Sequence, residues 1–537
     1  MTAVVLAFIV SLCIALSIVP ILSVVARRVG LVDHPDDKRK LHKMAIPMVG
    51  GVALFVAATC TALIIPQLDL LWRPLFEHIN STVASYTHPR IGNRLTRGLH
   101  VGQNDVFQLV GLLLGATVLM LVGLADDRFG IRGRQKLAGQ FAAVTVLILF
   151  GYQFDYITVA GFDIEFGIFS VFVIYAWVIA SINSVNLLDG ADGIASTIGI
   201  VMSVAMTVMM VYQGKILDAV VTASIAGGLL GFLKYNFPPA KAYLGDTGSM
   251  LIGFLLSALA IRCTFKQSSA YAFFAPIALL AIPFADTLAA IIRRRLTGRS
   301  IFAVDRGHLH HSLARRGYSP SVSLLWVAMF CSATAAGGTM SLIFKQSEYA
   351  LVSIFIVGCV MIFFRIFGVG ELQLVTRRAS AVARSVLRVA PSESPDLLQS
   401  AVHVQGERSW DAIWSELCLF ANQYSLDKIT LDVNAPWLHE SFHANRRRAG
   451  TTGELNHQWH VEIPIISEGK LFGKVQVAAS PQFGFTHHQI ISELMQVIAL
   501  VEGTLARKKP LRRGRWKFRL RRQVLNLLNR AEGLKQR

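Results

Sequence analysis

The sequence predicts an all-α polytopic membrane protein with about eleven transmembrane helices, followed by a small C-terminal α+β cytosolic domain. The composition supports this fold class, because 53% of the 537 residues are hydrophobic and only 16% are charged, whereas roughly a quarter of a typical soluble domain is charged. Long apolar runs recur through residues 1–370, and the composition becomes ordinary beyond Arg378. These observations exclude an ordinary soluble enzyme and a disordered chain. The six cysteines form no CxxC pair, so no disulfide or zinc framework is expected.

Eleven apolar runs account for the membrane part of the chain, each near the roughly 20 residues that a helix needs to cross a bilayer. The first run lacks a preceding basic segment and a small-residue cleavage site, so we expect a retained helix rather than a signal peptide. The runs are Val4–Val25, Ile46–Ile65, Val106–Leu124, Leu137–Tyr152, Ile168–Ser184, Ile194–Tyr212, Val220–Tyr235, Met250–Ile261, Ala272–Ile292, Leu324–Ile343 and Ala350–Phe367.

Basic residues set the predicted orientation, because short loops rich in Lys and Arg stay in the cytoplasm. Such loops follow the first, third and ninth runs, whereas residues 66–105 carry only four basic residues. The N-terminus is therefore expected outside, and the odd number of spans places the C-terminal domain in the cytoplasm. We expect a multi-pass protein of the inner (plasma) membrane, with Arg293–Arg295 acting as anchors on the cytoplasmic side.

Four segments follow from these patterns: a transmembrane domain (residues 1–370), a linker (371–396), an α+β domain (397–506) and a basic tail (507–537). No motif indicates the role of the α+β domain, for which regulation and assembly are both open. Its periodicity predicts two helices and three strands. The helices are Ser409–Gln423 and His487–Leu505; the strands are Lys428–Val433, Trp459–Ile465 and Leu471–Ala478, the last two forming a hairpin around Glu468-Gly469.

The tail supplies most of the positive charge. It holds thirteen basic residues and one acidic residue, and thus +12 of the net charge of +19. Because the charge is concentrated there, we expect no nucleic-acid partner for the chain as a whole. Apolar side chains between the basic ones are typical of an interfacial helix on anionic lipid, and a solvated basic tail is the alternative.

Polar residues gather at four span ends, all on the predicted cytoplasmic side. An Asp at the centre of a lone transmembrane helix costs roughly 2.5–3.5 kcal/mol, so the five aspartates of these clusters would cost on the order of 12–17 kcal/mol together if they faced lipid. We therefore expect them at a wet interface or around a cation. The clusters contain Asp126 and Asp127; Asn183, Asn186, Asp189 and Asp192; Tyr243 and Asp246; and Arg306, His308, His310 and His311.

These residue types suit phosphoryl transfer with Mg²⁺, since a hard cation prefers oxygen ligands and shares its shell with substrate phosphates. A transporter usually places its polar groups near mid-bilayer. Each cluster also has a simpler explanation: a solvated helix end, a set of helix caps, a turn, or, for the histidines, a basic loop or a zinc site without suitably spaced Cys or acidic partners. Four clusters on one face favour the catalytic interpretation.

In these motifs the sequence resembles the polyprenyl-phosphate N-acetylhexosamine-1-phosphate transferases, glycosyltransferase family 4 in the broad sense. The first loop, Asp33-His-Pro35-Asp-Asp-Lys-Arg39-Lys40-Leu-His42-Lys43, is similar to the family's D-x-P-x-x-R-K-x-H signature and continues into Pro47-Met-Val-Gly50-Gly51. The Asp pair, the N-x-x-N-x-x-D-G-x-D-G run, the G-D-x-G-S loop and the H-x-H-H motif match in order. The resemblance covers residues 1–370.

The resemblance implies that the chain transfers a sugar 1-phosphate from a UDP-sugar to polyprenyl phosphate, giving polyprenyl diphosphate sugar and UMP, as the initiating step of cell-envelope polysaccharide synthesis. It implies Mg²⁺ as the cofactor, with Mn²⁺ as an alternative. By position it implies a role for each matching residue: Asp246 and Asn186 for the metal, Asp126 and Asp127 for the lipid phosphate or its deprotonation, Lys136 for phosphate, Asp189 and Asp192 for the nucleotide, Tyr243 for uracil, Arg306, His308, His310 and His311 for diphosphate or sugar, and His42, Lys43 and Asn183 for further substrate contacts.

The residues leave two alternatives to this function open. The Asp305-Arg-Gly-His-Leu-His-His311 loop resembles the branch that uses UDP-N-acetylglucosamine, and the same-fold alternative is the phospho-N-acetylmuramoyl-pentapeptide transferase of peptidoglycan synthesis. The alternative of another class is a membrane transporter with a cytosolic sensor domain. The expected partners are the UDP-sugar, polyprenyl phosphate and the bilayer, and both a monomer and a homodimer are open.

Overall fold

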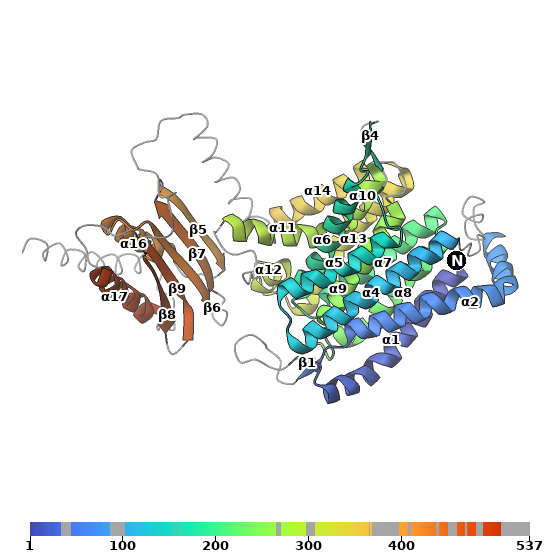
Figure 1. Ribbon diagram of the computed structural model, residues 1–537, viewed down its shortest axis with the longest axis horizontal. Helices are drawn as coiled ribbons and strands as arrows, with labels where there is room; N and C mark the ends of the chain where they lie inside the picture. Colours follow the sequence, from blue (N-terminus) through green and yellow to red (C-terminus); the bar gives the residue numbers. More distant parts are fainter. Residues whose placement is uncertain are drawn as a thin grey trace, which may run out of the picture. The chain divides into compact units, whose positions relative to one another are not determined.

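The computed structural model of the chain divides into two compact units (Figure 1). The helical unit comprises Met1–Leu288 and His308–Phe367, and the sheet unit comprises Ala289–Gly307 and Gly368–Arg537. The residues described within these bounds are 1–33, 45–85, 102–154, 156–159, 162–264, 270–296, 307–364, 366–367, 397–405, 410–435, 440–448, 459–467, 470–479 and 487–505.

Each of the eleven predicted apolar runs coincides with a helix or a helix pair. The helices are α1 (Thr2–Val29), α2 (Gly50–Ser85), α4 (Gln103–Phe129), α5 (Gly133–Leu149), α6 (Phe169–Leu188), α7 (Ile194–Gln213), α8 (Ile216–Asn236), α9 (Gly245–Thr264), α10 (Ala270–Leu279), α11 (Ala281–Leu296), α12 (Leu309–Arg315), α13 (Pro320–Phe344) and α14 (Glu348–Phe363). Two short antiparallel pairs join them, β1 (Val32–Asp33) with β2 (Ile46–Pro47) and β3 (Tyr156–Val159) with β4 (Phe162–Glu165).

Eight helices of the described chain are long and apolar enough to cross a membrane: α1, α2, α4, α6, α7, α8, α9 and α13. The number of eleven is therefore not confirmed. The helices α5 and α14 have only 17 and 16 residues, and the run at Ala272–Ile292 is divided into α10 and α11, which meet at a bend of 71° and would bring the number to nine if they formed one span. A helix needs about 20 residues to cross a bilayer, and α5 and α14 are shorter than that. The chain is a mostly helical, multi-span membrane protein.

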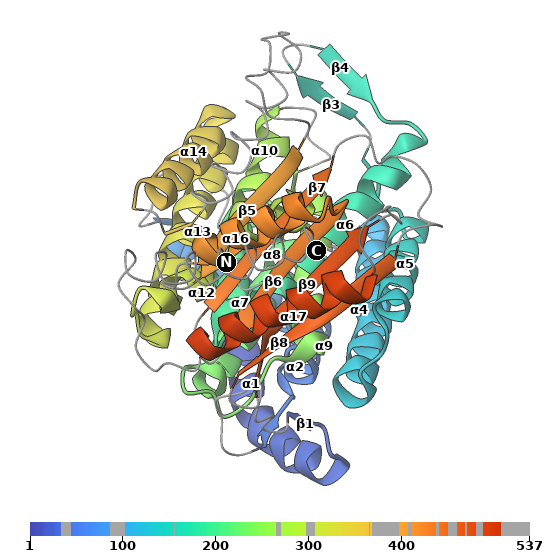
Figure 2. The same ribbon diagram turned by 90° about the vertical axis from the view of Figure 1, so that its left-hand side faces the viewer.

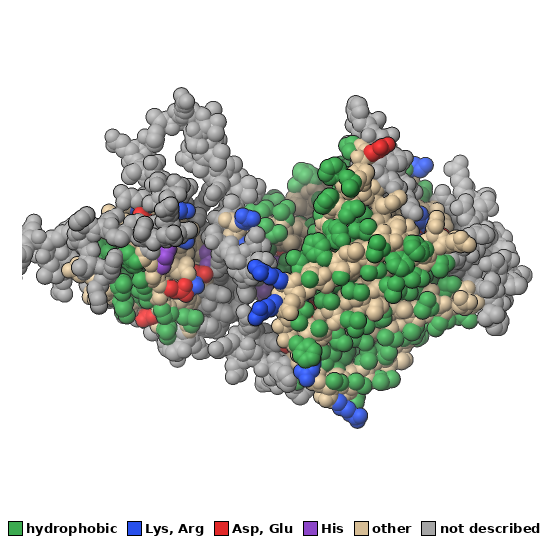
Figure 3. Space-filling model, in the orientation of Figure 1, with side chains coloured by type: hydrophobic (Ala, Val, Ile, Leu, Met, Phe, Trp, Pro, Cys, Tyr) green, Lys and Arg blue, Asp and Glu red, His purple; other side chains and the backbone are tan. Residues whose placement is uncertain are grey.

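The helices α8 and α9 lie at the centre of the helical unit. Within their spanning windows, 89% and 94% of the residues are buried, compared with 28% for α1. The outer helices expose large apolar side chains, such as Ile21 of α1 and Phe355 of α14. Figure 3 shows one face of the helical unit covered largely by hydrophobic side chains, with charged side chains at its margins. Such a surface suits lipid, whereas soluble monomers rarely expose a large apolar area.

One end of the helical unit is closed by a buried polar network around Arg262, close to the end of α9. The guanidinium donates to Asp218 of α8 (2.7 Å), Gln108 of α4 (2.5 Å) and Asp105 of α4 (3.2 Å). The ammonium group of Lys215 donates to the Arg262 carbonyl oxygen (2.5 Å). Because each buried charge has a partner of opposite sign or a hydrogen bond, the network joins three helices without leaving an uncompensated charge.

The sheet unit contains one antiparallel sheet in the order β5-β7-β6-β9-β8 and two helices. Both predicted helices and all three predicted strands are confirmed, whereas the hairpin turn at 468–469, the linker and the tail lie outside the described residues. Two strands were not predicted, β5 and β7. The elements are β5 (Leu397–Gln405), α16 (Trp410–Gln423), β6 (Lys428–Ala435), β7 (Glu440–Arg448), β8 (Trp459–Ser467), β9 (Lys470–Ala479) and α17 (His487–Leu505).

The two helices cover one face of this sheet (Figure 2). Their apolar sides enclose a core with alternate strand residues, including Leu431, Phe442 and Val475. Arg446 of β7 lies on the same face, and its guanidinium donates to the Cys418 carbonyl oxygen of α16 (2.5 Å). The buried Arg446 thus extends the core from a strand whose sequence is largely polar.

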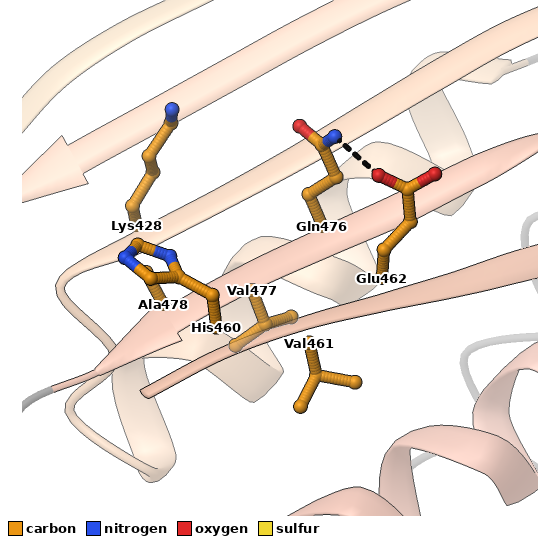
Figure 4. Close-up of a pocket in the computed structure, with 7 residues that line it drawn as sticks. All are labelled: Lys428, His460, Val461, Glu462, Gln476, Val477 and Ala478. Atoms are coloured by element: carbon orange, nitrogen blue, oxygen red, sulfur yellow. Dashed lines mark hydrogen bonds between the residues drawn. The ribbon is translucent and has the colours of Figure 1, made fainter. Parts of the chain in front are cut away.

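The other face of the sheet is polar. It carries a shallow pocket of about 310 Å³ lined by residues of β6, β8 and β9, with Lys428 and His460 on one side (Figure 4). On the other side Gln476 donates to the Glu462 carboxylate (2.7 Å). Antiparallel sheets commonly keep one face in water, and these exposed side chains are typical of such a face.

Candidate active site

Four of the predicted site residues meet at one end of the helical unit, each from a different helix. Lys136 of α5 lies between two carboxylates: its Nζ is 2.5 Å from Asp126 Oδ2 of α4 and 2.8 Å from Asp246 Oδ2 of α9. Asn186 of α6 donates through Nδ2 to Asp246 Oδ1 (2.6 Å) and to Ser249 Oγ (2.9 Å). We call Asp126, Lys136, Asn186 and Asp246 the acidic cluster. Its centre is Asp246, whose side chain is 37% exposed, compared with 7% for Asp126.

Asp127, the neighbour of Asp126, points to the start of α9. Its carboxylate accepts hydrogen bonds from the backbone N–H groups of Asp246 (2.8 Å) and Thr247 (3.1 Å) and from the Thr247 hydroxyl (2.5 Å). The first N–H groups of a helix have no partner within it, so Asp127 caps α9 from outside the helix. The two adjacent aspartates therefore separate in space, one facing Lys136 and the other holding the helix that carries Asp246.

Two glycines allow the helix ends to approach each other at backbone distance. A Cβ added to Gly123 of α4 would lie 2.4 Å from Thr247 Cα, and one added to Gly51 of α2 would lie 2.5 Å from the backbone nitrogen of Gly248. The Pro47–Gly51 segment and the Gly245–Ser249 segment are thus packed against each other. This close packing determines the position of Asp246 relative to Asp126.

We expect Gly123→Ala to lower the free energy of unfolding by about 1–3 kcal/mol, because its Cβ would displace backbone atoms of α9. Gly133→Ala in α5 is the matched control, since nothing lies within 4 Å of a Cβ added there. Thermal unfolding of the two variants in detergent tests this expectation. Equal stability of the two variants would contradict the close contact between α4 and α9.

The other polar residues of the second cluster lie in α6 (Asn183) and in the segment between α6 and α7 (Asp189 and Asp192). Asn183 does not reach the acidic cluster; its amide bonds to Gln140 of α5 (2.8 Å). Asp192 accepts a hydrogen bond from the Ala240 N–H (2.9 Å) and so fixes the segment before α9. Asp189 is half-buried, and burial together with the nearby carboxylates Asp246, Asp127 and Asp192 raises the pKa of Asp189 well above its usual range.

Tyr243 lies just before α9 and is held by its backbone. Its N–H donates to the Pro47 carbonyl oxygen (2.9 Å), and its own carbonyl oxygen accepts from the N–H groups of Val49 and Gly50 (3.1 Å each). Burial, with Asp192 and Asp33 nearby, raises the pKa of Tyr243 to about 12. The phenol ring is therefore neutral at physiological pH.

The three predicted histidines lie side by side at the start of α12. The rings of His308 and His310 are parallel within 3°, with their centroids 6.0 Å apart, and the rings of His310 and His311 are 4.2 Å apart. A Cβ added to Gly190 would lie 2.8 Å from His310 Nε2, so this ring packs directly against the segment that carries Asp189 and Asp192. The structure thus brings the second and fourth polar clusters of the sequence together. Arg306, His42 and Lys43 lie outside the described residues.

Comparison with known proteins shows the family to which the chain belongs. The sequence family described as glycosyl transferase family 4 matches residues 109–264, which include α5 to α9 and most of α4. A decaprenyl-phosphate N-acetylglucosaminephosphotransferase of Mycobacterium tuberculosis is 30% identical over 350 residues, covering 61% of this chain and 80% of that protein. The chain belongs to glycosyl transferase family 4.

Two other relatives of this family 4 chain are matched over a larger share of their own length. A protein of Bacillus subtilis named as a probable undecaprenyl-phosphate N-acetylglucosaminyl 1-phosphate transferase is 29% identical over 368 residues, which are 68% of this chain and 91% of that protein. The undecaprenyl-phosphate alpha-N-acetylglucosaminyl 1-phosphate transferase of Escherichia coli is 26% identical over 374 residues, which are 68% of this chain and 89% of that protein. The predicted family is therefore confirmed.

Several residues that contact the candidate site residues were not predicted from the sequence. Thr247 and Ser249 stand inside the G-D-x-G-S loop but were not assigned a role. Gln140 and Asp286 stand within apolar runs, where a polar residue is costly in lipid. A polar residue inside an apolar run was therefore the sequence signal by which Gln140 and Asp286 could have been found. Asp286 is 1% exposed and contacts His308, as described below.

Proposed function

We propose that this family 4 chain transfers N-acetylglucosamine 1-phosphate from UDP-N-acetylglucosamine to polyprenyl phosphate. An oxygen of the lipid phosphate attacks the phosphorus that bears the sugar, and the bond from that phosphorus to the bridging oxygen breaks, so that UMP leaves. The observation that carries the proposal is the acidic cluster, which joins two carboxylates, an amide and an ammonium group from four helices at one end of the helical unit. The names of the relatives in three genera support both the sugar and the lipid acceptor.

The donor atoms of the cluster fit a hard divalent cation, Mg²⁺ or alternatively Mn²⁺. Asp246 and the amide oxygen of Asn186 would hold the ion, since Mg²⁺ takes one or two carboxylates and completes its shell with water and substrate phosphates. Among the described residues no group of three His, Cys, Asp or Glu side chains could hold a metal ion by itself, which agrees with a site completed by substrate. When bound, the ion would neutralise charge on the transferring phosphoryl group.

The residues of the chain bind and orient the two phosphorylated substrates. Lys136 would hold a phosphate by charge, with its ammonium group in the middle of the cluster, within 3 Å of carboxylate oxygens of Asp126 and Asp246. Asp126 would orient the lipid phosphate or accept its proton, whereas Asp127 supports α9. Such positioning supplies much of the rate in phosphoryl transfer.

The remaining predicted residues would bind the UDP-sugar. Tyr243 offers a neutral ring to uracil, and Asp189 and Asp192 would line the nucleotide site. The diphosphate or the sugar would meet the histidines. By resemblance the same substrates would also contact His42, Lys43, Asn183 and Arg306; His308, His310 and His311 form the row described above.

The topology that goes with this proposal has eleven spans, counting α5, the α10–α11 pair and α14, with the acidic cluster on the cytoplasmic face of the plasma membrane. Cytosolic UDP-sugars would then reach the site directly. The sheet unit would lie on the same side after a linker at 371–396, and the basic tail at 507–537 would bind anionic lipid. A homodimer and a monomer are both compatible with this reaction.

The test is a reaction of the purified protein with polyprenyl phosphate, a panel of UDP-sugars and Mg²⁺, followed by identification of the lipid product. We expect UMP and polyprenyl diphosphate N-acetylglucosamine in equal amounts, and none after chelation of the metal with EDTA; addition of Mg²⁺ or Mn²⁺ should restore the reaction. Product from the UDP-muramoyl-pentapeptide alone would establish the peptidoglycan alternative. Solute uptake by proteoliposomes without UMP release from any UDP-sugar would establish a transporter and contradict the proposal.

A further inference from the structure

We propose that Asp286 is a positioning residue for the histidine row: it fixes His308 and the start of α12, and so directs the histidines toward the diphosphate of the sugar donor. The inference rests on the proposed function for the identity of that anion. Asp286 belongs to α11 and stands 22 positions before His308, outside the four polar clusters at the span ends.

The carboxylate of Asp286 makes two contacts with consecutive residues. Its Oδ2 lies 2.6 Å from His308 Nδ1, and its Oδ1 accepts a hydrogen bond from the Leu309 N–H (2.8 Å). Asp286 is 1% exposed and His308 is 5% exposed. A buried carboxylate requires partners of this kind, and here both partners belong to the segment that carries the histidines.

The contact with Nδ1 fixes the orientation of the His308 ring and determines which of its nitrogens can face a ligand. When Nδ1 donates its proton to the carboxylate, Nε2 is the nitrogen that remains for a ligand, and a carboxylate partner of this kind holds both the ring orientation and the tautomer. The second contact holds the Leu309 backbone, so neither the ring nor the chain that carries it can rotate independently.

The effect extends along the row through ring packing. His310 lies parallel to His308 at 6.0 Å and close to His311 at 4.2 Å, and its other side rests against Gly190. The row is therefore held between Asp286 on one side and the Asp189–Asp192 segment on the other. Loss of the Asp286 carboxylate would release the first ring, and with it the spacing of the others.

The experiment is a double-mutant cycle of Asp286→Asn and His308→Ala, read as kcat and KM for UDP-N-acetylglucosamine. We expect each single variant to lower kcat/KM by about 10- to 100-fold, as for other groups that orient a functional histidine. Because Asp286 acts through His308, the double variant should be no worse than the poorer single variant. Asp286→Glu keeps a carboxylate and should recover part of the loss.

The matched control is Asp218→Asn, which also removes a buried carboxylate that has a close side-chain partner, here Arg262, but at the other end of the helical unit. We expect this variant to change thermal stability and leave kcat/KM unaltered. The proposal would be overturned if the two substitutions lowered kcat/KM independently, so that the double variant showed the product of the two losses. It would also be overturned if the lower activity of Asp286→Asn matched a lower fraction of folded protein.

The failure of the proposed function would be visible separately, as an absence of UMP release by the unaltered protein from every UDP-sugar. In that case the same four proteins of the cycle are compared for inorganic pyrophosphate binding by calorimetry. The positioning role would be supported if Asp286→Asn weakens pyrophosphate binding in the unaltered protein but has no effect on binding in the His308→Ala variant. Equal pyrophosphate binding by all four proteins would overturn it.

Discussion

Replacement of Asp246 by Asn is expected to abolish turnover, with a loss of UMP release of about 10³-fold or more, as when a preorganised charge at a reacting phosphate or oxyanion is removed. Asp246 is the only carboxylate of the acidic cluster, among the described residues, that contacts both Lys136 and Asn186. The variant loses the charge opposite Lys136 and the proposed metal ligand in one step. The measurement is Mg²⁺-dependent UMP release by protein shown to be inserted and folded.

The matched control for this prediction is Asp105→Asn. Asp105 lies on α4, as Asp126 does, and its carboxylate also pairs with a cation, Arg262 (3.2 Å). The residue lies 21 positions earlier on the helix, which at 1.5 Å per residue places it about 30 Å from Asp126. Turnover should be unchanged in this variant. Substantial turnover by Asp246→Asn would refute the central role of the acidic cluster.

Replacement of Asp127 by Ala is expected to destabilise the protein rather than to alter the chemistry alone. The variant would leave two backbone N–H groups and the Thr247 hydroxyl at the start of α9 without their acceptor. Loss of a helix cap costs roughly 0.5–2 kcal/mol, and each unsatisfied buried group costs about 1–3 kcal/mol. We therefore expect the free energy of unfolding to fall by about 2–4 kcal/mol.

The comparison that sharpens this prediction is Asp126→Asn. The adjacent carboxylate faces Lys136 and not the start of α9, so its loss should reduce turnover strongly with little change in thermal stability. The two aspartates would then separate into one that acts on substrate and one that holds the helix. Identical stability and activity profiles for the two variants would contradict this division.

Physical arguments from the sequence predicted which polar residues gather, because an aspartate at the end of an apolar span has few acceptable environments. Asp126, Asn186 and Asp246 were expected together and are found together. Pairwise geometry was not predictable: Asn183 faces Gln140 instead of the cluster, and Asp127 caps α9. Such partners depend on how helices rotate against one another, which the hydrophobic pattern of a fully buried helix does not record.

The sheet unit shows a similar division. The helix Trp410–Gln423 and the strand Lys428–Ala435 have clear amphipathic periods, from which a helix over Ser409–Gln423 and a strand over Lys428–Val433 were predicted. The strand Glu440–Arg448 was missed because its inward positions include Arg446 as well as Phe442 and Ala444, so apolar and polar residues do not alternate. Its burial depends on contacts with α16 that only the tertiary structure supplies.

The helices α4 and α9 carry an ionic network at each end and pack against each other in between. The intervening stretch is made of fully buried apolar side chains such as Leu112, Leu119 and Phe254. From Asp246 to Arg262 this dry stretch is about 24 Å long, at 1.5 Å per residue. An ion or sugar passing between these helices would have to shed its hydration over that whole length, which is prohibitively costly without compensating groups. The contact between α4 and α9 therefore offers no polar path between the two networks, and polar reactants would have to reach the acidic cluster from its own end of the helical unit.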